Sequence, residues 1–176
     1  VSVVIPNFNG MAYLDGVLSS LERQTIRNFE VILVDNGSTD GSCAFVSAEY
    51  PWVHMIQLPE NYGFSRAVNE GIRAARSPYV LLLNNDTEAE PDFLEEMVAA
   101  LRRHKKAFSC QAKMIQLHDR DKMDDAGNYY CALGWAFARG KGKDIRHYDR
   151  EQKIFSTCAG AAIYRKKFID LSLIHI

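Results

Sequence analysis

A run of apolar and aromatic residues at positions 79–83, Tyr-Val-Leu-Leu-Leu, is followed at once by the polar residues Asn84, Asn85 and Asp86. A short, continuous apolar run is typical of a strand buried on both faces, as in a parallel sheet covered by helices. In open α/β sheets, ligands bind beyond the carboxyl ends of the strands. The sequence therefore predicts that a rigid strand holds a carboxylate and two amides at a binding site.

Strand and helix patterns alternate through the first 103 residues and are joined by short links. This order is typical of βαβ units, whose crossovers are right-handed. We expect an α/β fold with a doubly wound, Rossmann-like, mostly parallel sheet and helices on both faces. The expected elements are strands at residues 1–5, 30–34, 53–58 and 79–83, and helices at residues 11–24, 42–49, 65–75 and 91–103.

The pattern changes after about residue 104. Residues 107–117 predict one strand, whereas residues 122–148 are rich in glycine and charge and show no clear period. A long segment of that kind predicts a functional or mobile loop. Small apolar residues at 156–164 then lead to a helix that begins near Arg165. No repeat or linker interrupts the chain, so we expect a single domain over residues 1–176.

The composition excludes several classes of protein. The chain has 176 residues, 47% of them hydrophobic, and a net charge of −1, so nothing in the total charge indicates a nucleic-acid partner. The four cysteines contain no C-x-x-C pair, which argues against a zinc site and for reduced thiols in a cytoplasmic protein. No apolar run approaches the ~20 residues of a membrane-spanning helix, and no signal peptide is expected.

Three predicted strand ends, at residues 6–9, 35–40 and 84–88, should meet at one edge of the sheet. A pyrimidine base needs a donor and an acceptor at its edge, and Asp35 or Asn36 can contribute to that recognition. A diphosphate needs a divalent cation, and Mg²⁺ or Mn²⁺ typically takes only one or two carboxylates from the protein. Asp86 matches that demand, and the cation would neutralise charge on a departing nucleotide diphosphate.

Four motifs in order carry a resemblance to a known family: V-S-V-V-I-P-N-F-N-G, F-E-V-I-L-V-D-N-G-S-T-D-G-S, N-Y-G-F-S-R-A-V-N-E-G-I and Y-V-L-L-L-N-N-D-T. Together they resemble glycosyltransferase family 2, and within it the branch of rhamnosyltransferases and related bacterial polysaccharide and cell-wall enzymes. The resemblance covers residues 1–103 and resumes at C-A-G-A-A-I-Y-R-K-K-F, residues 158–168. It divides the domain into a nucleotide-sugar-binding half, residues 1–103, and the start of an acceptor-side half, residues 104–176.

The resemblance implies a GT-A fold and an inverting, metal-assisted transfer of a sugar from a UDP- or dTDP-type donor to a glycan or lipid-linked acceptor. It places the nucleoside against the loop after the first strand and the base against the acid and amide after the second. The family often has a second acid at position 36, where this chain has an amide. The only metal ligand that it assigns is Asp86, the one acid of the Asn84-Asn85-Asp86 motif. The expected substrate-binding residues are Pro6, Asn7, Phe8, Asp35, Asn36, Asn61, Gly63, Arg66 and Asn85.

The family's general base is expected beyond residue 170, and residues 171–176 do not resemble the family's continuation there. No catalytic residue is therefore assigned, and we expect the chain to bind a donor with little or no transfer. The basic clusters at residues 102–106 and 139–146 either face solvent or contact anionic lipid. A peripheral contact at the inner face of the plasma membrane therefore stays an open expectation.

Other interpretations stay open beside this one. Asp35 and Asp86 are also residue types that cap turns, Asn61 and Gly63 can shape a loop only, and Arg66 can be solvated on its helix. A dinucleotide-dependent dehydrogenase is excluded because the first strand lacks a following G-x-G-x-x-G, and a sugar-nucleotide pyrophosphorylase because it lacks a Gly-rich loop with a basic residue. A nucleotide-sugar-binding fragment or inactive relative remains the alternative function.

Overall fold

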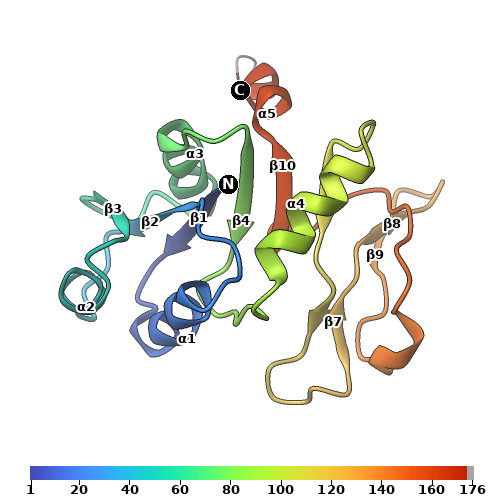
Figure 1. Cartoon of the computed structure of the whole chain (residues 1–176), viewed down its shortest axis with the longest axis horizontal. Coiled ribbons are helices and arrows are strands. Elements are labelled where there is room, and N and C mark those ends of the chain that lie inside the picture. The colour runs from blue at the N-terminus through green and yellow to red at the C-terminus, as the bar shows by residue number, and fades with distance from the viewer. Residues whose placement is uncertain (174–176) are drawn as a thin grey trace.

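The computed structural model of the protein describes residues 1–173. A six-stranded sheet in the order β3-β2-β1-β4-β10-β5 forms its centre, with the first four strands parallel and β10 antiparallel to both β4 and β5. This arrangement, shown in Figure 1, confirms the α/β, doubly wound and mostly parallel fold. The sheet comprises β3 (His54–Leu58), β2 (Glu30–Asn36), β1 (Ser2–Asn7), β4 (Tyr79–Leu83), β10 (Ala161–Arg165) and β5 (Ser109–Gln111).

Alternation along the strands sends side chains to the two faces of the sheet. Val3 and Ile5 of β1 pack in one apolar cluster with α1, α2 and α4, while Val4 packs in a second cluster with α3. All three of these β1 side chains are fully buried, because helices cover both faces. The helices are α1 (Met11–Glu22), α2 (Ser42–Glu49), α3 (Phe64–Ala74), α4 (Phe93–Arg103) and α5 (Lys166–Leu173).

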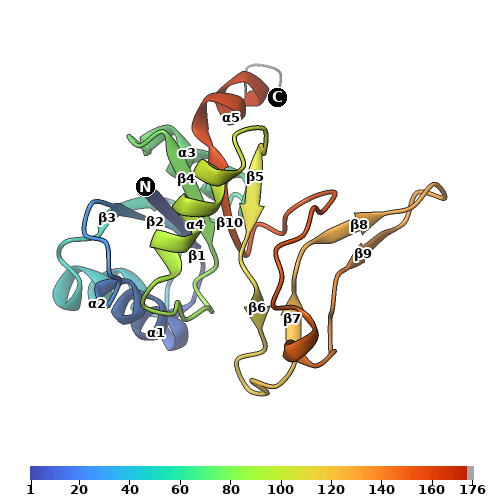
Figure 2. The same cartoon turned by 45° about the vertical axis from the view of Figure 1, so that its right-hand side comes forward.

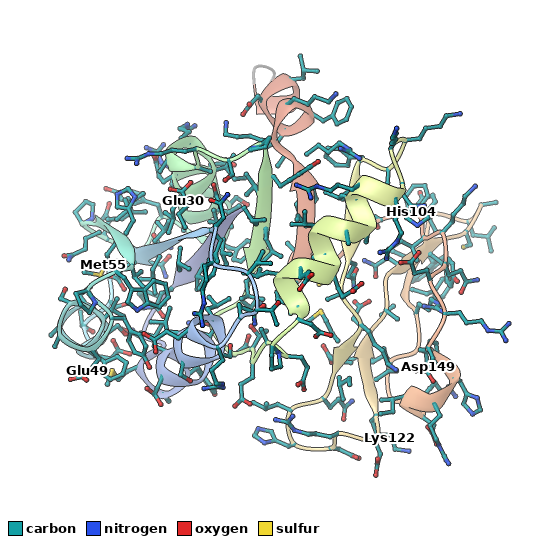
Figure 3. The ribbon with its side chains drawn as sticks, in the orientation of Figure 1. Glu30, Glu49, Met55, His104, Lys122 and Asp149 are labelled. Carbon is teal, nitrogen blue, oxygen red and sulfur yellow. The ribbon has the colours of Figure 1, made fainter. Side chains whose placement is uncertain are left out.

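Figure 3 labels side chains on two opposite sides of the molecule. Glu49 ends α2 and Met55 lies in β3, and both stand at the same edge of the molecule. His104 follows the last residue of α4 at the opposite side. The helices and strands of the parallel half, residues 1–103, agree with the expected ones to within two residues at each end.

The single strand expected at residues 107–117 is wrong. The chain forms β5, then leaves the main sheet and pairs as β6 (Met114–Ile115) with β7 (Met123–Asp125). The pairing with β10 ends where the Ala112 N–H donates to the Ala161 carbonyl at 3.0 Å. Lys113 then turns outward, and its Nζ lies 2.6 Å from Asp149 Oδ1. Apolar residues recur on both sides of the break, in β5 and in β6, so the sequence pattern did not mark it.

The long irregular loop expected at residues 122–148 is also wrong in part. It contains β7, the hairpin β8 (Asn128–Tyr130) to β9 (Ala136–Ala138), and the 3-10 turn η1 (Ile145–His147). Strands of three residues are too short to display a period of two, which is why the sequence pattern missed them. The β8–β9 hairpin projects from the side of the molecule that lies away from β3 (Figure 2).

Two further expectations concern the chain as a whole. The single domain over residues 1–176, divided at about residue 103, stays a prediction. Among the described residues 1–173, no helix is both long enough and apolar enough to cross a bilayer.

Candidate functional site

A cleft of about 360 Å³ opens at the carboxyl edge of the parallel strands. Because β1, β2 and β4 are neighbours and parallel, their ends meet there, with Asn7 directly opposite Asp35 in the register. The volume of the cleft lies in the range of small-molecule sites. The cleft is lined by Pro6, Asn7, Phe8, Asn36, Asn61, Gly63, Phe64, Ala67, Asn84, Asn85 and Asp86.

Asn7 joins the three strand ends beneath this cleft. Its Oδ1 accepts a hydrogen bond from Asn85 Nδ2 at 2.8 Å, and its own Nδ2 donates to Asp35 Oδ1 at 2.9 Å. The side chain is only 1% exposed, so these bonds satisfy an amide that burial has removed from water. The loops that follow β1, β2 and β4 are therefore tied to one another.

Asp35 lies behind Asn7 and is 2% exposed. Its Oδ2 accepts from the Ser38 N–H at 2.9 Å. Burial acts to raise the pKa of Asp35, but hydrogen bonds from Ser38, Asn7 and Cys43 outweigh it and hold the pKa below its usual value. Burial and the bond to Asp35 in turn raise the pKa of the Cys43 thiol to about 11. Asp35 is therefore an ionised support of the site, set back from the residues that line the cleft.

Asn36 does line the cleft, and it fixes the loop that precedes α3. Its Nδ2 donates to Asn61 Oδ1 at 2.8 Å and to the Gly63 carbonyl at 3.2 Å, and its Oδ1 accepts from the Tyr62 N–H at 3.0 Å. Gly63 has a φ of +85°, a backbone angle that favours glycine, and the following residue begins α3. Asn61 and Gly63 thus shape this loop and also border the cleft.

Asp86 stands just past β4, exposed and on the cleft lining. The start of its loop is held where the Asn84 N–H donates to the Gly160 carbonyl at 2.9 Å. Among residues 1–173, no group of three or more His, Cys, Asp or Glu side chains is placed to hold a metal ion. A single carboxylate beside the Asn85 amide nevertheless fits Mg²⁺ or Mn²⁺, since both take most of their oxygen ligands from phosphate and water.

Arg66, like Asp35, is an expected substrate-binding residue that does not line the cleft. Its Nε lies 2.7 Å from Glu70 Oε1 on the exposed surface of α3, and it does not border the cleft. Pro6 and Phe8 do border it. The general base expected beyond residue 170 stays a prediction, and residues 174–176 lie outside the described residues.

Three cleft residues were absent from the expected set: Phe64, Ala67 and Asn84. Phe64 is 53% exposed although it is large and apolar, and Phe8 on the same cleft is 48% exposed. The aromatic residue directly after the N-Y-G segment was the available signal for Phe64. Nothing in the sequence identified Ala67 as a cleft residue. It borders the cleft because it is a buried residue near the start of α3.

A family model described as "Glycosyl transferase family 2" matches residues 2–172. The chain belongs to glycosyl transferase family 2. Among curated relatives, it is 29% identical over 128 residues to the putative teichuronic acid biosynthesis glycosyltransferase TuaG of Bacillus subtilis. That match covers 70% of this chain and 50% of TuaG. The putative glycosyltransferase EpsH of the same organism is 34% identical over 101 residues, which cover 56% of this chain and 29% of EpsH.

Solved structures show the GT-A fold of this family 2 member. S. aureus TarS 1–349 in complex with UDP-GlcNAc matches with a TM-score of 0.71 and 22% identity, over 98% of this chain and 47% of that chain. The mannosyltransferase PcManGT from Pyrobaculum calidifontis, in complex with GDP-Man and Mn²⁺, matches with a TM-score of 0.66 and 16% identity, over 97% and 46%. The chain thus spans half or less of these relatives' length.

Proposed function

We propose that this chain binds a nucleotide-diphosphate sugar of the UDP or dTDP type and belongs to an inverting, metal-assisted glycosyltransferase. The observation that carries the proposal is the cleft at the ends of β1, β2 and β4, where two exposed aromatic side chains, several amides and one carboxylate meet. This mixture suits a ligand with a flat base at one end and a diphosphate at the other. TarS with bound UDP-GlcNAc, a protein of the same fold, supports this choice of ligand.

The base lies against the aromatic side of the cleft in this proposal. Phe8 and Phe64 offer ring faces on which a pyrimidine can stack. Both hydrogens of Asn36 Nδ2 are engaged by protein oxygens. Its Oδ1 accepts one hydrogen bond from the described residues 1–173, from the Tyr62 N–H, and has a second lone pair for a donor on the base. Asn36 is thus the group that reads the base edge, and Asp35 contributes by holding Asn7.

The diphosphate lies toward Asp86. Asp86, with water and phosphate oxygens, would hold Mg²⁺ or Mn²⁺, and the bound cation would offset the charge of the two phosphates. PcManGT, of the same fold, is described with Mn²⁺, which supports this assignment. The Asn85 amide, oriented by its bond to Asn7, keeps the adjoining backbone in place. Arg66 would contact phosphate only after its ion pair with Glu70 breaks.

The transfer itself is a single displacement. The acceptor hydroxyl oxygen forms a bond to the anomeric carbon while the bond from that carbon to the diphosphate breaks, and the nucleotide diphosphate leaves with the electron pair. The hydroxyl proton passes to a general base, which the family resemblance places beyond residue 170. Neither a base nor the loss of transfer activity is assigned to the described residues.

We further propose a glycan or lipid-linked acceptor and a cytoplasmic location with contact to the inner membrane surface. The name of TuaG, a teichuronic acid enzyme, supports a glycan product. Exposed apolar side chains on the β8–β9 hairpin, among them Leu133 and Trp135, support a membrane contact near the basic residues 139–146. Co-sedimentation with anionic vesicles tests it, and a protein that stays in the supernatant contradicts it.

Calorimetry with UDP-, dTDP- and GDP-sugars, with and without Mn²⁺, tests donor binding. Wild-type protein should bind a UDP- or dTDP-sugar more tightly when Mn²⁺ is present. In Asp86→Ala, the gain in affinity on adding Mn²⁺ should be at least about tenfold smaller. Glu49→Ala removes an exposed acid at the end of α2 that does not line the cleft; it is the matched control and should behave as wild type. An unchanged cation effect in Asp86→Ala refutes the metal assignment.

Product analysis with the same donors separates an enzyme from a binding module. Glycosylated acceptor supports the transferase. Donor binding without product supports the alternative, a nucleotide-sugar-binding fragment or an inactive relative. Failure to bind any nucleotide sugar excludes both.

A further inference from the structure

The amide of Gln24 lies at the point where the end of α1 meets the loop between β4 and α4. The side chain is 1% exposed. Its Nε2 donates to the Glu90 carbonyl at 2.8 Å and to the Ser20 carbonyl at 3.2 Å, and its Oε1 accepts from the Leu94 N–H at 2.9 Å. A buried amide whose donors and acceptor all bond to backbone holds that backbone in place, because losing any of these bonds leaves a buried polar group unpaired.

Two neighbouring contacts hold the same loop to α1. Ser20 Oγ accepts from the Ala89 N–H at 3.0 Å, and the Thr25 N–H donates to the Pro91 carbonyl at 2.8 Å. Together with Gln24, these contacts bind three consecutive loop residues, 89–91, to the last turn of α1 and the residues just after it. The segment therefore has a defined place relative to the helix.

The other end of the loop is held at the cleft. Asn85 Nδ2 donates to Asn7 Oδ1 at 2.8 Å, and Thr87 Oγ1 donates to the Asn84 carbonyl at 2.7 Å. Only residues 86–88 separate Asn85 from the segment bound to α1. Those three residues span at most about 11 Å, so a displacement of residues 89–91 that exceeds the slack of this short segment must move Asp86.

We propose that Gln24 is a positioning residue for Asp86. It does not border the cleft, and it acts by fixing the far end of the loop whose near end carries the carboxylate. This inference rests on the proposed function, because it concerns the cation that Asp86 holds there. Residues that orient a metal ligand typically change metal affinity by about 10- to 100-fold when they are replaced.

The test is the ratio of nucleotide Kd values measured without and with millimolar Mn²⁺. The ligand is whichever of UDP, dTDP and GDP binds wild-type protein most tightly. Gln24→Met keeps the length of the side chain but removes both donors and the acceptor, and its ratio should fall about tenfold relative to wild type. Ser20→Ala removes the acceptor for the Ala89 N–H, together with a bond that Ser20 Oγ donates to the Val17 carbonyl within α1. Because only one of the bonds to the loop is lost, its ratio should fall in the same direction by less.

Leu18→Ala is the control for general loss of stability. Leu18 is fully buried in the same helix, and its apolar side chain makes none of the hydrogen bonds that hold the loop, so its truncation destabilises the protein without removing one of those bonds. All variants are compared at a temperature where circular dichroism shows them folded. Leu18→Ala should keep the wild-type ratio. Ser20→Ala serves alone if Gln24→Met does not fold.

The outcomes separate this inference from the function on which it rests. A wild-type protein that binds no nucleotide, or binds it without a cation effect, overturns the metal assignment and this role with it. A cation effect in wild type that persists in both Gln24→Met and Ser20→Ala overturns only the positioning role. An equal loss in Leu18→Ala overturns it too, because the effect then follows stability.

Discussion

Gly10 is the residue that allows the amides beneath the cleft to meet. A Cβ at this position would lie 2.1 Å from Asn85 Nδ2 and 2.3 Å from Asn7 Oδ1, the two atoms of the bond that joins β1 to β4. Both distances are far shorter than any van der Waals contact. The absence of a side chain at position 10 is therefore a condition for the site.

Gly10→Ala should lower the free energy of unfolding by about 1–3 kcal/mol, since it overpacks a buried contact. It should also weaken nucleotide binding, because Asn7 and Asn85 cannot both keep their places. Urea unfolding and calorimetry measure the two effects.

Gly16→Ala is the matched control for that substitution. A Cβ there would meet the Glu88 side chain at an ordinary 3.5 Å. Because alanine favours a helix over glycine, this variant should be neutral or more stable by up to ~1 kcal/mol. Equal stability of Gly10→Ala and wild type would contradict the close packing described here.

At the scale of elements, β10 holds the end of α4 through the half-buried Arg165. Its Nη2 donates to the Leu101 carbonyl at 2.6 Å, and its Nε donates to the Ala107 carbonyl at 3.0 Å. Carbonyls at the end of a helix lack partners within the helix, and a cation there also suits the helix dipole. One side chain from the antiparallel strand therefore joins α4 to the sheet.

Arg165→Met should lower the free energy of unfolding by about 1.5–3 kcal/mol, the range for hydrogen bonds to a charged group. Thermal and urea unfolding measure this loss. Lys106→Met removes an exposed cation just after the same helix and should change stability by no more than about 0.5 kcal/mol. If the two variants lost equal stability, the loss would follow from removing a positive charge near α4 and not from the hydrogen bonds of Arg165 to the Leu101 and Ala107 carbonyls.

At the scale of the whole molecule, burial differs sharply between the parallel sheet and the β8–β9 hairpin. Val3, Val4 and Ile5 in β1 are fully buried, whereas Leu133 is 85% exposed and Trp135 is 66% exposed. Hydrogen bonds that are open to solvent break locally more often than those in the core.

Hydrogen exchange should therefore be fastest at residues 131–137 and slowest in β1 and β4. Mass spectrometry of peptic fragments at neutral pH measures the difference. A nucleotide that binds in the cleft should slow exchange at residues 84–88 and leave the hairpin unchanged. Protection of the hairpin equal to that of β1 would contradict this ranking.

Sequence pattern alone determined the parallel half of the fold and the place of the site. Runs such as residues 79–83 are buried on both faces, so their hydrophobicity is continuous and readable, and polar residues that follow them must stand at the carboxyl edge. The same reasoning brought Pro6, Asn7, Asn36, Asn85 and Asp86 to one cleft, where the structure also places them.

Tertiary structure decided what each of these side chains contacts. Asp35 and Asn36 are adjacent in sequence, yet alternation along β2 turns one toward Asn7 behind the cleft and the other toward the loop at Asn61. The end of the strand at residues 109–111 and the bonds of Gln24 to Glu90 depend likewise on partners distant in the chain. Local pattern reports how much of a residue is buried, but hydrogen-bond partners are set only when separate segments meet.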